Sequence, residues 1–416
     1  MKRFAAPDCR SDLRSVCSCE SIERPKLVDA VDRLAGEEGF FGRHLADKPH
    51  LFAGFSVRVP RTDFEAMTDL VSVVEALSRL PAYREAVSQW APSALDSQSH
   101  GEGLFMGYDF HLTDEGPRLI EINTNAGGAF LCAAAAEAAC HCWNDQEPAE
   151  RFEEGVTQAF RREWWLAGRP GSLESVAIVD DAPSTQFLHP EFELAKAMLE
   201  RHGIAVEVAD PSRLSAAGDR LVGGKGAVDL VYNRSTDFGL SDPGHASLRW
   251  AYDEATALVS PSPRHHALLA HKRNLTLLSD PDRMRGLGAS DADLSALRLI
   301  PRTVAVTASD AESLWTARKS LFFKPVASHA SKGVYRGAKL TRSVFRDIVD
   351  ADYVAQSFVP APERSVELDG ETVRRKVDVR LYTHAGTVLL AAARIYQGQA
   401  TNMLTEGGGF APVFVG

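Results

Sequence analysis

Apolar and polar residues follow different periods in successive parts of the chain, and each period predicts a type of element. In residues 63–80 (DFEAMTDLVSVVEALSRL) the apolar positions recur at helical spacing, and we expect residues 1–100 to be mostly helical. Residues 103–112 and 117–123 instead alternate with a period near two, and the Thr-Asp-Glu-Gly stretch between them is typical of a turn. This part of the chain therefore predicts a β-hairpin.

A second region begins at the short apolar run of residues 176–179 and predicts alternating strands and helices. Residues 190–210 favour a helix that stops at Gly203 and a strand after it, which together with the first strand make a βαβ unit. Residues 228–234 add a third strand, followed by a long loop and a helix. We therefore expect a small doubly wound domain with parallel strands.

Strands dominate the pattern after residue 260, with one helix expected around residues 267–278. Strands are expected at residues 303–306, 321–325, 353–360, 376–384 and 387–396, with turns at 369–370 and 385–386. The expected division is a helical region with the hairpin, a parallel-sheet domain and a strand-rich region, at residues 1–145, 146–260 and 261–416.

Bulk composition narrows the class of protein. A chain of 416 residues exceeds the size of a single ordinary core, and 44% hydrophobic and 25% charged residues are globular values. A net charge of -10 argues against a nucleic-acid or membrane-surface partner. No apolar run reaches the roughly 18–20 residues that span a bilayer, and the first residues lack a signal-peptide core, so a cytoplasmic location is expected.

The cysteines have two interpretations. A zinc site at Cys140-His141-Cys142 is one, but adjacent C-x-C residues without a second matched pair are weak evidence of metal. Reduced thiols, partly on a helix packed inside the protein (LCAAAAEAACHCW), are favoured in a large cytosolic chain. The six residues are Cys9, Cys17, Cys19, Cys132, Cys140 and Cys142.

The predicted hairpin carries candidate metal ligands. Glu121 and Asn123 lie two apart on one strand and so share a face, and antiparallel pairing can bring Asp109 beside them. Carboxylate and amide oxygens suit Mg²⁺, which keeps coordination sites for phosphate oxygens. The alternative is an exposed acidic hairpin, but the whole pattern Asp…Glu-x-Asn-Thr-x-x-Gly favours a magnesium site.

Lysines further along the chain are candidate phosphate ligands. Lys324 ends the apolar strand LFFKP, where a buried ammonium is costly unless it meets an anion. The loop at residues 328–333, which ends at Lys332 and Gly333, can fold over phosphates and offer backbone N–H groups. Lys272 is a second candidate cation. The alternative interpretation of Lys272 is a solvated helix residue, and the alternative interpretation of Lys324 is a surface lysine before a proline turn.

The strand YVAQSFV supplies a candidate adenine slot. Purine rings need an apolar surface and a few hydrogen bonds, which Gln356, Ser357, Phe358 and Val359 can provide. An ordinary core strand explains the same residues.

Two arginines and an asparagine near the C-terminus are candidate catalytic residues. Arg380 shares a strand face with Asp378, Arg394 ends the next strand, and Asn402 precedes a glycine-rich stretch at 407–409. Arginine suits the charge that develops in phosphoryl transfer. A salt-bridged sheet face is the alternative.

Together these segments resemble the ATP-grasp superfamily. FFKP resembles its lid-strand lysine, YVAQSFV resembles its adenine hinge, and DVR…R…N…GG is similar to the strand pair of ribosomal-protein glutamate ligases. The hairpin GYDFHL…LIEINTNAGG resembles the metal hairpin of D-alanine–D-alanine ligases and glutathione synthetases. That hairpin usually comes last, whereas here it comes early, as in the circularly permuted, eukaryotic-type glutathione synthetases. Ser328 stands where those enzymes have a third metal-binding Glu, so glutathione is not implied as the product.

The resemblance implies an α/β fold with an α+β lid: a circularly permuted ATP-grasp core and a small parallel-sheet (pre-ATP-grasp) substrate domain. It also implies ATP and Mg²⁺ as cofactors and an ATP-dependent carboxylate–amine ligase acting on an amino acid or short peptide. A small-molecule kinase and a non-catalytic ATP-binding protein are the alternatives, and a homodimer is expected only by analogy. Tyr232, Asn233, Arg234 and Asp237 are candidate substrate-pocket residues, although loop polar residues usually face water. All of this requires the hairpin near residue 120 to meet the cations of the C-terminal strands.

Overall fold

The computed structural model describes residues 21–95, 101–139, 148–326, 333–368, 371–399, 401 and 406–416. The predictions for Lys332, Asn402, Ser328 and most of the 328–333 loop lie outside these residues and stay predictions. The same holds for zinc at Cys140, His141 and Cys142. Within the described ranges, no helix has both the length and the apolar character needed to cross a membrane.

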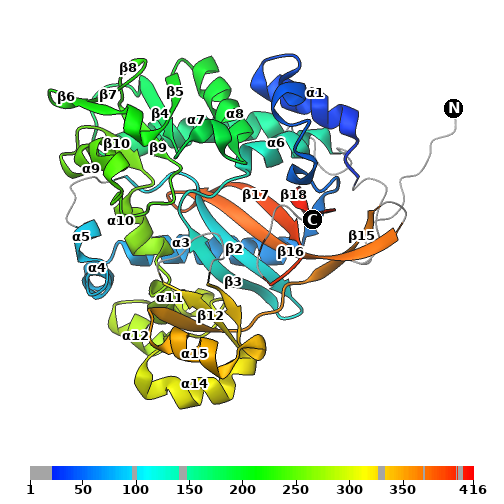
Figure 1. The fold of residues 1–416 in the computed structure, drawn as a ribbon, viewed down its shortest axis with the longest axis vertical. Helices are drawn as coiled ribbons and strands as arrows, with labels where there is room; N and C mark the ends of the chain where they lie inside the picture. Colours follow the sequence, from blue (N-terminus) through cyan, green and yellow to red (C-terminus); the bar gives the residue numbers. More distant parts are fainter. Residues whose placement is uncertain are drawn as a thin grey trace.

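A large sheet runs through the centre of the molecule and joins early and late parts of the chain (Figure 1). Its path is β1-β18-β17-β16-β2-β3, and β15 also pairs with β16. β2 and β3 form the predicted hairpin, and β2 pairs with β16 so that Asp109 lies opposite Arg380. The hairpin therefore meets the C-terminal strands, as the sequence predicts. The strands are β1 (Val57–Val59), β2 (Met106–Thr113), β3 (Gly116–Asn123), β15 (Glu363–Leu368), β16 (Glu371–His384), β17 (Thr387–Tyr396) and β18 (Gly409–Val415).

The two faces of this sheet are covered differently. On one face, Tyr108, Phe110 and Leu381 pack in a core with helix α3 (Arg61–Ser78). On the other face, Tyr382 packs in the core that contains helices α1 (Arg24–Ala35), α6 (Ala129–Ala138) and α7 (Pro148–Leu166). Side chains alternate along a strand, so Asp109 shares this second face with Tyr382. Within the described residues, the helices leave part of the face uncovered, and that part carries the polar residues of the candidate site.

Helix α6 approaches the sheet closely because its residues are small. At Gly128, which precedes the helix with φ 104°, a Cβ atom would lie 2.1 Å from the Phe410 ring. The buried Glu191 carboxylate accepts hydrogen bonds from the N–H groups of Gly128 at 2.7 Å and Phe130 at 3.3 Å, and so caps the helix N-terminus. Cys132 is buried in this helix with a free thiol, which agrees with the packed-helix interpretation of the cysteines.

The predicted parallel domain is present as the sheet β10-β9-β4-β5. Helix α8 (His189–Arg201) ends just before Gly203, which has φ +79° as a helix stop requires. A small antiparallel sheet, β6-β7-β8, was not predicted. The elements are β4 (Ser175–Val179), β5 (Ala205–Ala209), β6 (Ser215–Ala217), β7 (Arg220–Gly223), β8 (Gly226–Ala227), β9 (Leu230–Asn233), α9 (Ala246–Asp253) and β10 (Leu258–Ser260).

An antiparallel lid sheet, β11-β14-β12-β13, lies beyond the hairpin (Figure 1). One face packs on helices α14 (Ala311–Ala317) and α15 (Arg342–Val349) through Phe323 and Phe345. Phe322 pairs with Gln356 across the sheet, and both line the opposite face. The strands are β11 (Thr303–Ala305), β12 (Leu321–Pro325), β13 (Tyr335–Arg336) and β14 (Tyr353–Ser357).

The helix expected at residues 267–278 is broken. A π-helical turn, η6 (His266–Ala270), is followed by His271 in an extended conformation and then by helix α11 (Asn274–Leu278). Lys272 lies in this break, so the alternative interpretation of Lys272 as a solvated helix residue does not hold. The remaining helices are α2 (Phe40–His44), α4 (Pro81–Ser88), α5 (Pro92–Leu95), α10 (Pro263–His265), α12 (Pro281–Gly286) and α13 (Asp291–Leu297).

Candidate functional site

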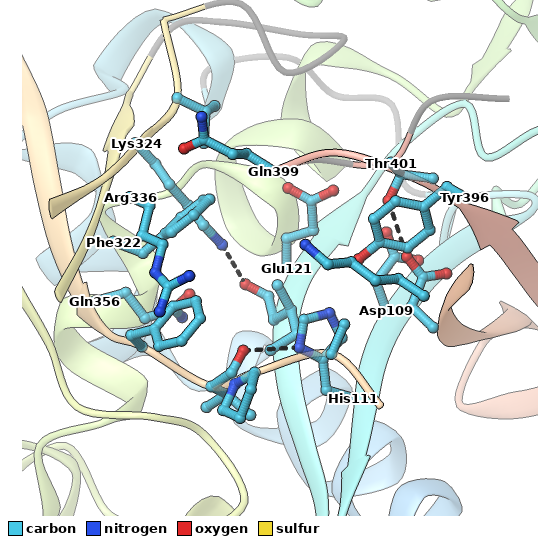
Figure 2. Close-up of a pocket in the computed structure, with 18 of the residues that line it drawn as sticks. Asp109, His111, Glu121, Phe322, Lys324, Arg336, Gln356, Tyr396, Gln399 and Thr401 are labelled. Atoms are coloured by element: carbon cyan, nitrogen blue, oxygen red, sulfur yellow. Dashed lines mark hydrogen bonds between the residues drawn. The ribbon is translucent and has the colours of Figure 1, made fainter. Parts of the chain in front are cut away.

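A cavity of about 420 Å³ lies between the lid sheet and the uncovered face of the large sheet. This volume is within the range of small-molecule sites. Figure 2 shows lid residues such as Lys324, Phe322 and Gln356 facing Glu121 of the hairpin. Residues predicted for the site that line it are Asp109, Glu121, Asn123, Lys272, Lys324, Gln356, Ser357, Phe358, Val359, Arg380 and Arg394.

Basic side chains outnumber acidic ones in the lining, although the chain as a whole is acidic. A cavity walled by protein concentrates such a local field and attracts anions. The basic residues are Lys272, Lys324, Arg336, Lys376, Arg380 and Arg394, and the acidic ones are Asp109, Glu121, Glu363 and Asp378.

Two aspartates and two arginines form a buried ionic cluster at the cavity floor. Arg380 donates from Nε and Nη2 to the two oxygens of Asp109 at 2.6 and 2.7 Å. Arg394 bridges the aspartates, with 2.7 Å bonds to Asp109 Oδ2 and Asp378 Oδ1. Burial alone would raise the pKa of Asp109, but the two guanidinium groups outweigh it and hold that pKa well below its usual range. The cluster fixes both arginines in position before any ligand arrives.

In the structure Asp109 is paired with two arginines. The sequence predicts a metal ligand, whereas in the structure both carboxylate oxygens accept charge-assisted bonds from the arginines. The exposed fraction of the residue is only 1%. Asp109 therefore holds Arg380 and Arg394 in place, and its role as a metal ligand stays a prediction.

Glu121 and Asn123 offer a better fit for a divalent cation. Asn123 Nδ2 donates to Asp109 Oδ2 at 3.0 Å and, at 3.4 Å, to Glu121 Oε1, so the amide already lies beside the carboxylates. Rotation of the Asn123 amide by a half-turn would put its oxygen, instead of its nitrogen, beside the Glu121 carboxylate. Two protein oxygens with space for phosphate oxygens match the few protein ligands that Mg²⁺ uses. Among the described residues, no group of three His, Cys, Asp or Glu side chains is placed to hold a metal ion.

Lys324 is a buried cation whose hydrogen bond goes to a neutral group. Its exposed fraction is 3%, and Nζ donates to Ile120 O at 2.7 Å. Burial lowers its pKa to about 8, against the attraction of Glu121. Nζ also lies 5.9 Å from the centre of the Phe322 ring. An ammonium held in this way is suited to an anion such as phosphate.

The strand predicted to hold adenine has an unsatisfied donor. Gln356 is buried, and its Nε2 atom has no hydrogen-bond partner among the described residues. A buried amide normally has one, so an acceptor on a ligand fits here. The backbone N–H groups of Ser357 and Phe358 are already used, donating to Arg302 O and Ser320 O at 2.8 Å each. Of these groups, only the Gln356 side chain is therefore left as a donor for a ligand, and the adenine hinge stays a prediction.

Gly333 does not line the cavity, although its neighbour Val334 does. It has φ +71°, and its carbonyl accepts a 3.0 Å bond from the Tyr353 hydroxyl, which fixes the start of β13.

The structure adds residues that the sequence did not single out. His111 lies on the same strand face as Asp109 and bonds Val359 O at 3.0 Å through Nδ1; the period of two could have found it. Arg336 lies over the Phe358 ring at 4.5 Å, and Thr401 donates to Asp378 Oδ2 at 2.9 Å. No local pattern marks these last two. Further additions are Phe322, Lys376 and Tyr396.

No protein-family model and no curated protein matches the chain. Among solved structures, the glutathione synthetase-like effector GSS30 from Globodera pallida, in apo form, superimposes with a TM-score of 0.56, at 12% identity, over 96% of this chain and 99% of its own. A protein from Methylobacillus flagellatus KT named as a gamma-glutamylcysteine synthetase gives a TM-score of 0.48, at 10% identity, over 80% and 83%. The ATP-grasp ligase PsnB, complexed with a minimal precursor, Mg and ADP, gives 0.30, at 16% identity, over 57% and 87%.

The first of these likenesses extends over nearly the whole of both chains, which confirms the predicted fold class. Identities this low say nothing about activity. The circular permutation stays a prediction.

Proposed function

Starting from an ATP-grasp-like fold of the glutathione synthetase-like type, we propose that this protein is an ATP-dependent carboxylate–amine ligase. ATP would lie in the cavity between lid and sheet, with its adenine near Gln356 and its phosphates near Lys324 and Lys272. The observation that supports this most is a pair of buried lid groups: an ammonium whose hydrogen bond goes to a neutral carbonyl, and an amide N–H that has no partner among the described residues. A nucleotide carries both complements, phosphate oxygens and ring nitrogen acceptors, on one molecule.

Bound Mg²⁺ would neutralise charge on the phosphate oxygens. Glu121 and Asn123 would hold it, and Asp109 would keep Arg380 and Arg394 aimed at the transferring phosphoryl group. Lys324 and Lys272 lower the repulsion between the γ-phosphate and an incoming carboxylate. These residues position charges and need form no covalent bond with the substrate.

The chemistry follows from this arrangement of charge. A carboxylate oxygen attacks the γ-phosphorus and ADP leaves, which gives an acyl phosphate. The nitrogen of an amine then attacks the acyl carbon, phosphate leaves, and the amine loses a proton. The two buried arginines lie where they can stabilise the oxygens in both steps.

The test is ATP-dependent ADP release with a panel of amino acids and short peptides, together with mass spectrometry of the products. We expect an amide product in a one-to-one ratio with ADP. ADP formed together with a stable phosphorylated product would indicate a kinase. Nucleotide binding without any ADP release would indicate a non-catalytic binding protein.

A further inference from the structure

A second, smaller cavity adjoins the first and shares three of its lining residues, Asn123, Lys272 and Arg380. A molecule in it would therefore lie beside the phosphate end of the proposed nucleotide site. Its other walls come from the end of β3, the loop after β9 and the π-turn η6. The remaining lining residues are Ile122, Thr124, Asn125, Ala126, Thr236, Phe238, His266 and Ala270.

These lining residues differ from the ones that the sequence singles out for substrate. Arg234 is buried and donates to Ala126 O at 2.9 Å, and Asp237 Oδ2 is bonded to the His245 ring at 2.9 Å. Their neighbours Thr236 and Phe238 form the wall instead. The loop after β9 thus contributes other residues to this cavity, and the substrate roles of Tyr232, Asn233, Arg234 and Asp237 stay predictions.

Two buried polar atoms in this cavity's lining residues have no hydrogen-bond partner in the part of the chain that the structure describes. They are Thr124 Oγ1 and Asn125 Oδ1, and the exposed fraction of Thr124 is only 6%. The Asn125 amide is oriented by its nitrogen, which donates to Ser235 O. Its oxygen is thus left as an acceptor, and the group that satisfies it must be a donor. An N–H group on a ligand fits this position.

The border with the first cavity is cationic, whereas one wall is flat and uncharged. Lys272 and Arg380 lie at the border with the first cavity. The His266 ring stacks on Phe238 with a centroid distance of 4.2 Å and an interplanar angle of 9°. Burial, followed by the charges of His271 and Lys272, lowers the pKa of His266 to about 3, so this ring is neutral near pH 7. A carboxylate is therefore favoured only at the Lys272 end.

Size limits the ligand further. The cavity has about 160 Å³, close to the roughly 150 Å³ that accommodates benzene in an engineered cavity. This space holds roughly six heavy atoms, the size of a single small amino acid, and the additional atoms of a dipeptide would have to lie outside it.

We propose that this cavity binds one small α-amino acid, of the size of glycine, alanine or serine, as the carboxyl donor. Its carboxylate lies toward Lys272 and Arg380, and its amino group donates to Asn125 Oδ1. The proposal rests on the proposed ligase function. The acyl phosphate would form as the carboxylate oxygen attacks the γ-phosphorus and ADP leaves.

Hydroxylamine gives a direct test. Its nitrogen attacks an acyl phosphate, phosphate leaves, and a hydroxamate accumulates that can be measured by colour or mass. With ATP, Mg²⁺ and hydroxylamine, we expect hydroxamates from glycine, alanine or serine, and at least tenfold less from leucine, phenylalanine or dipeptides.

Two variants examine the walls. Thr124→Val removes the unsatisfied hydroxyl with little change in shape. Because the amino acid loses a hydrogen-bond partner, we expect its KM to rise about tenfold while the KM for ATP stays within about twofold. Phe238→Ala enlarges the cavity on a partly exposed loop, and the ratio of kcat/KM for alanine to that for leucine should fall at least tenfold. Thr62→Val, at an exposed position on α3, is the matched control and should match the wild type.

Calorimetric titration with the non-hydrolysable analogue AMP-PNP separates the two proposals. If AMP-PNP binds but no single amino acid gives a hydroxamate, or only dipeptides do, the small-amino-acid assignment is wrong and the ATP site stands. If AMP-PNP does not bind, the proposed function fails and this inference fails with it. An unchanged alanine-to-leucine ratio in Phe238→Ala would also overturn the assignment of this cavity.

Discussion

Replacing Lys324 with methionine should stabilise the free protein and abolish nucleotide binding. Methionine keeps the length of the side chain but removes a charge that is buried with a pKa of about 8. Relative to a lysine in water with a pKa near 10.4, keeping that charge in the folded protein costs about 3 kcal/mol. Loss of the bond to Ile120 O offsets about 1 kcal/mol of this gain. The net gain of about 2 kcal/mol should raise the Tm by a few degrees.

The stability difference between the wild type and Lys324→Met should also depend on pH in a definite direction. Because the folded pKa of Lys324 is lowered, the unfolded chain binds more protons between about pH 8 and pH 10.4. The stability of the wild type relative to Lys324→Met should therefore rise across this interval, and the gap in Tm should close. Other groups that titrate there are common to both proteins and cancel in the difference.

The assay is thermal unfolding with and without ATP and Mg²⁺. ATP at 100 times its Kd should stabilise the wild type by about 2.7 kcal/mol and the variant not at all. Lys319→Met is the matched control, since Lys319 is exposed just before the same strand, and it should behave as the wild type in both conditions. A lower Tm in Lys324→Met, or an undiminished effect of ATP on it, would refute the reasoning.

Three further changes test other parts of the site. Glu121→Gln should abolish ADP formation, because it removes the carboxylate proposed to hold Mg²⁺; a coupled ADP assay measures this. Asp109→Asn removes the negative charge that neutralises part of the charge of two buried guanidinium groups. The free energy of unfolding should therefore fall by about 3–5 kcal/mol and the Tm by several degrees. The His245 ring is bonded to Asp181 at 2.7 Å and to Asp237 at 2.9 Å, and these carboxylates raise its pKa despite its burial. The stability that the charged ring adds is therefore fully present below about pH 6.5 and is lost as the pH rises through the raised pKa. The Tm deficit of His245→Gln should accordingly shrink at alkaline pH.

Each of these has a clear contrary result. Turnover at the wild-type rate in Glu121→Gln would remove the metal assignment. An Asp109→Asn protein as stable as the wild type would mean that the ionic cluster is not a structural anchor. A Tm deficit in His245→Gln that is the same at pH 6 and pH 9 would contradict a charged His245 clamp.

Local patterns predicted the elements that carry the site. The alternation in β2 and β3 and the turn between them gave the hairpin, and the apolar run before Lys324 gave the lid strand. Within the described residues, eight strands were not predicted: the short β1, β6, β8, β10 and β13, and the longer β7, β15 and β18. For the short ones the reason is plain. Two or three residues carry too little periodicity to separate a strand from a loop, so their pairing depends on tertiary contacts.

The residue types of the site could be predicted from the sequence, but which side chains bond to one another could not. Asp109 was found because its carboxylate shares a face with Glu121. Its pairing with Arg380 depends on the register of strands 271 residues apart in sequence, which no local pattern specifies. The position of Lys272 depends on the π-turn that breaks the expected helix, and such a turn has no reliable sequence signature.

Isotope transfer tests the proposed chemistry most directly. The protein is incubated with ATP, Mg²⁺, an amine and a mixture of amino acids whose carboxyl groups carry ¹⁸O, and the released phosphate is weighed by mass spectrometry. Attack of a carboxylate on the γ-phosphorus predicts one ¹⁸O atom in each phosphate released. Phosphate that contains only unlabelled oxygen while ADP accumulates would mean that water, not a carboxylate, receives the phosphoryl group, and would contradict the ligase assignment.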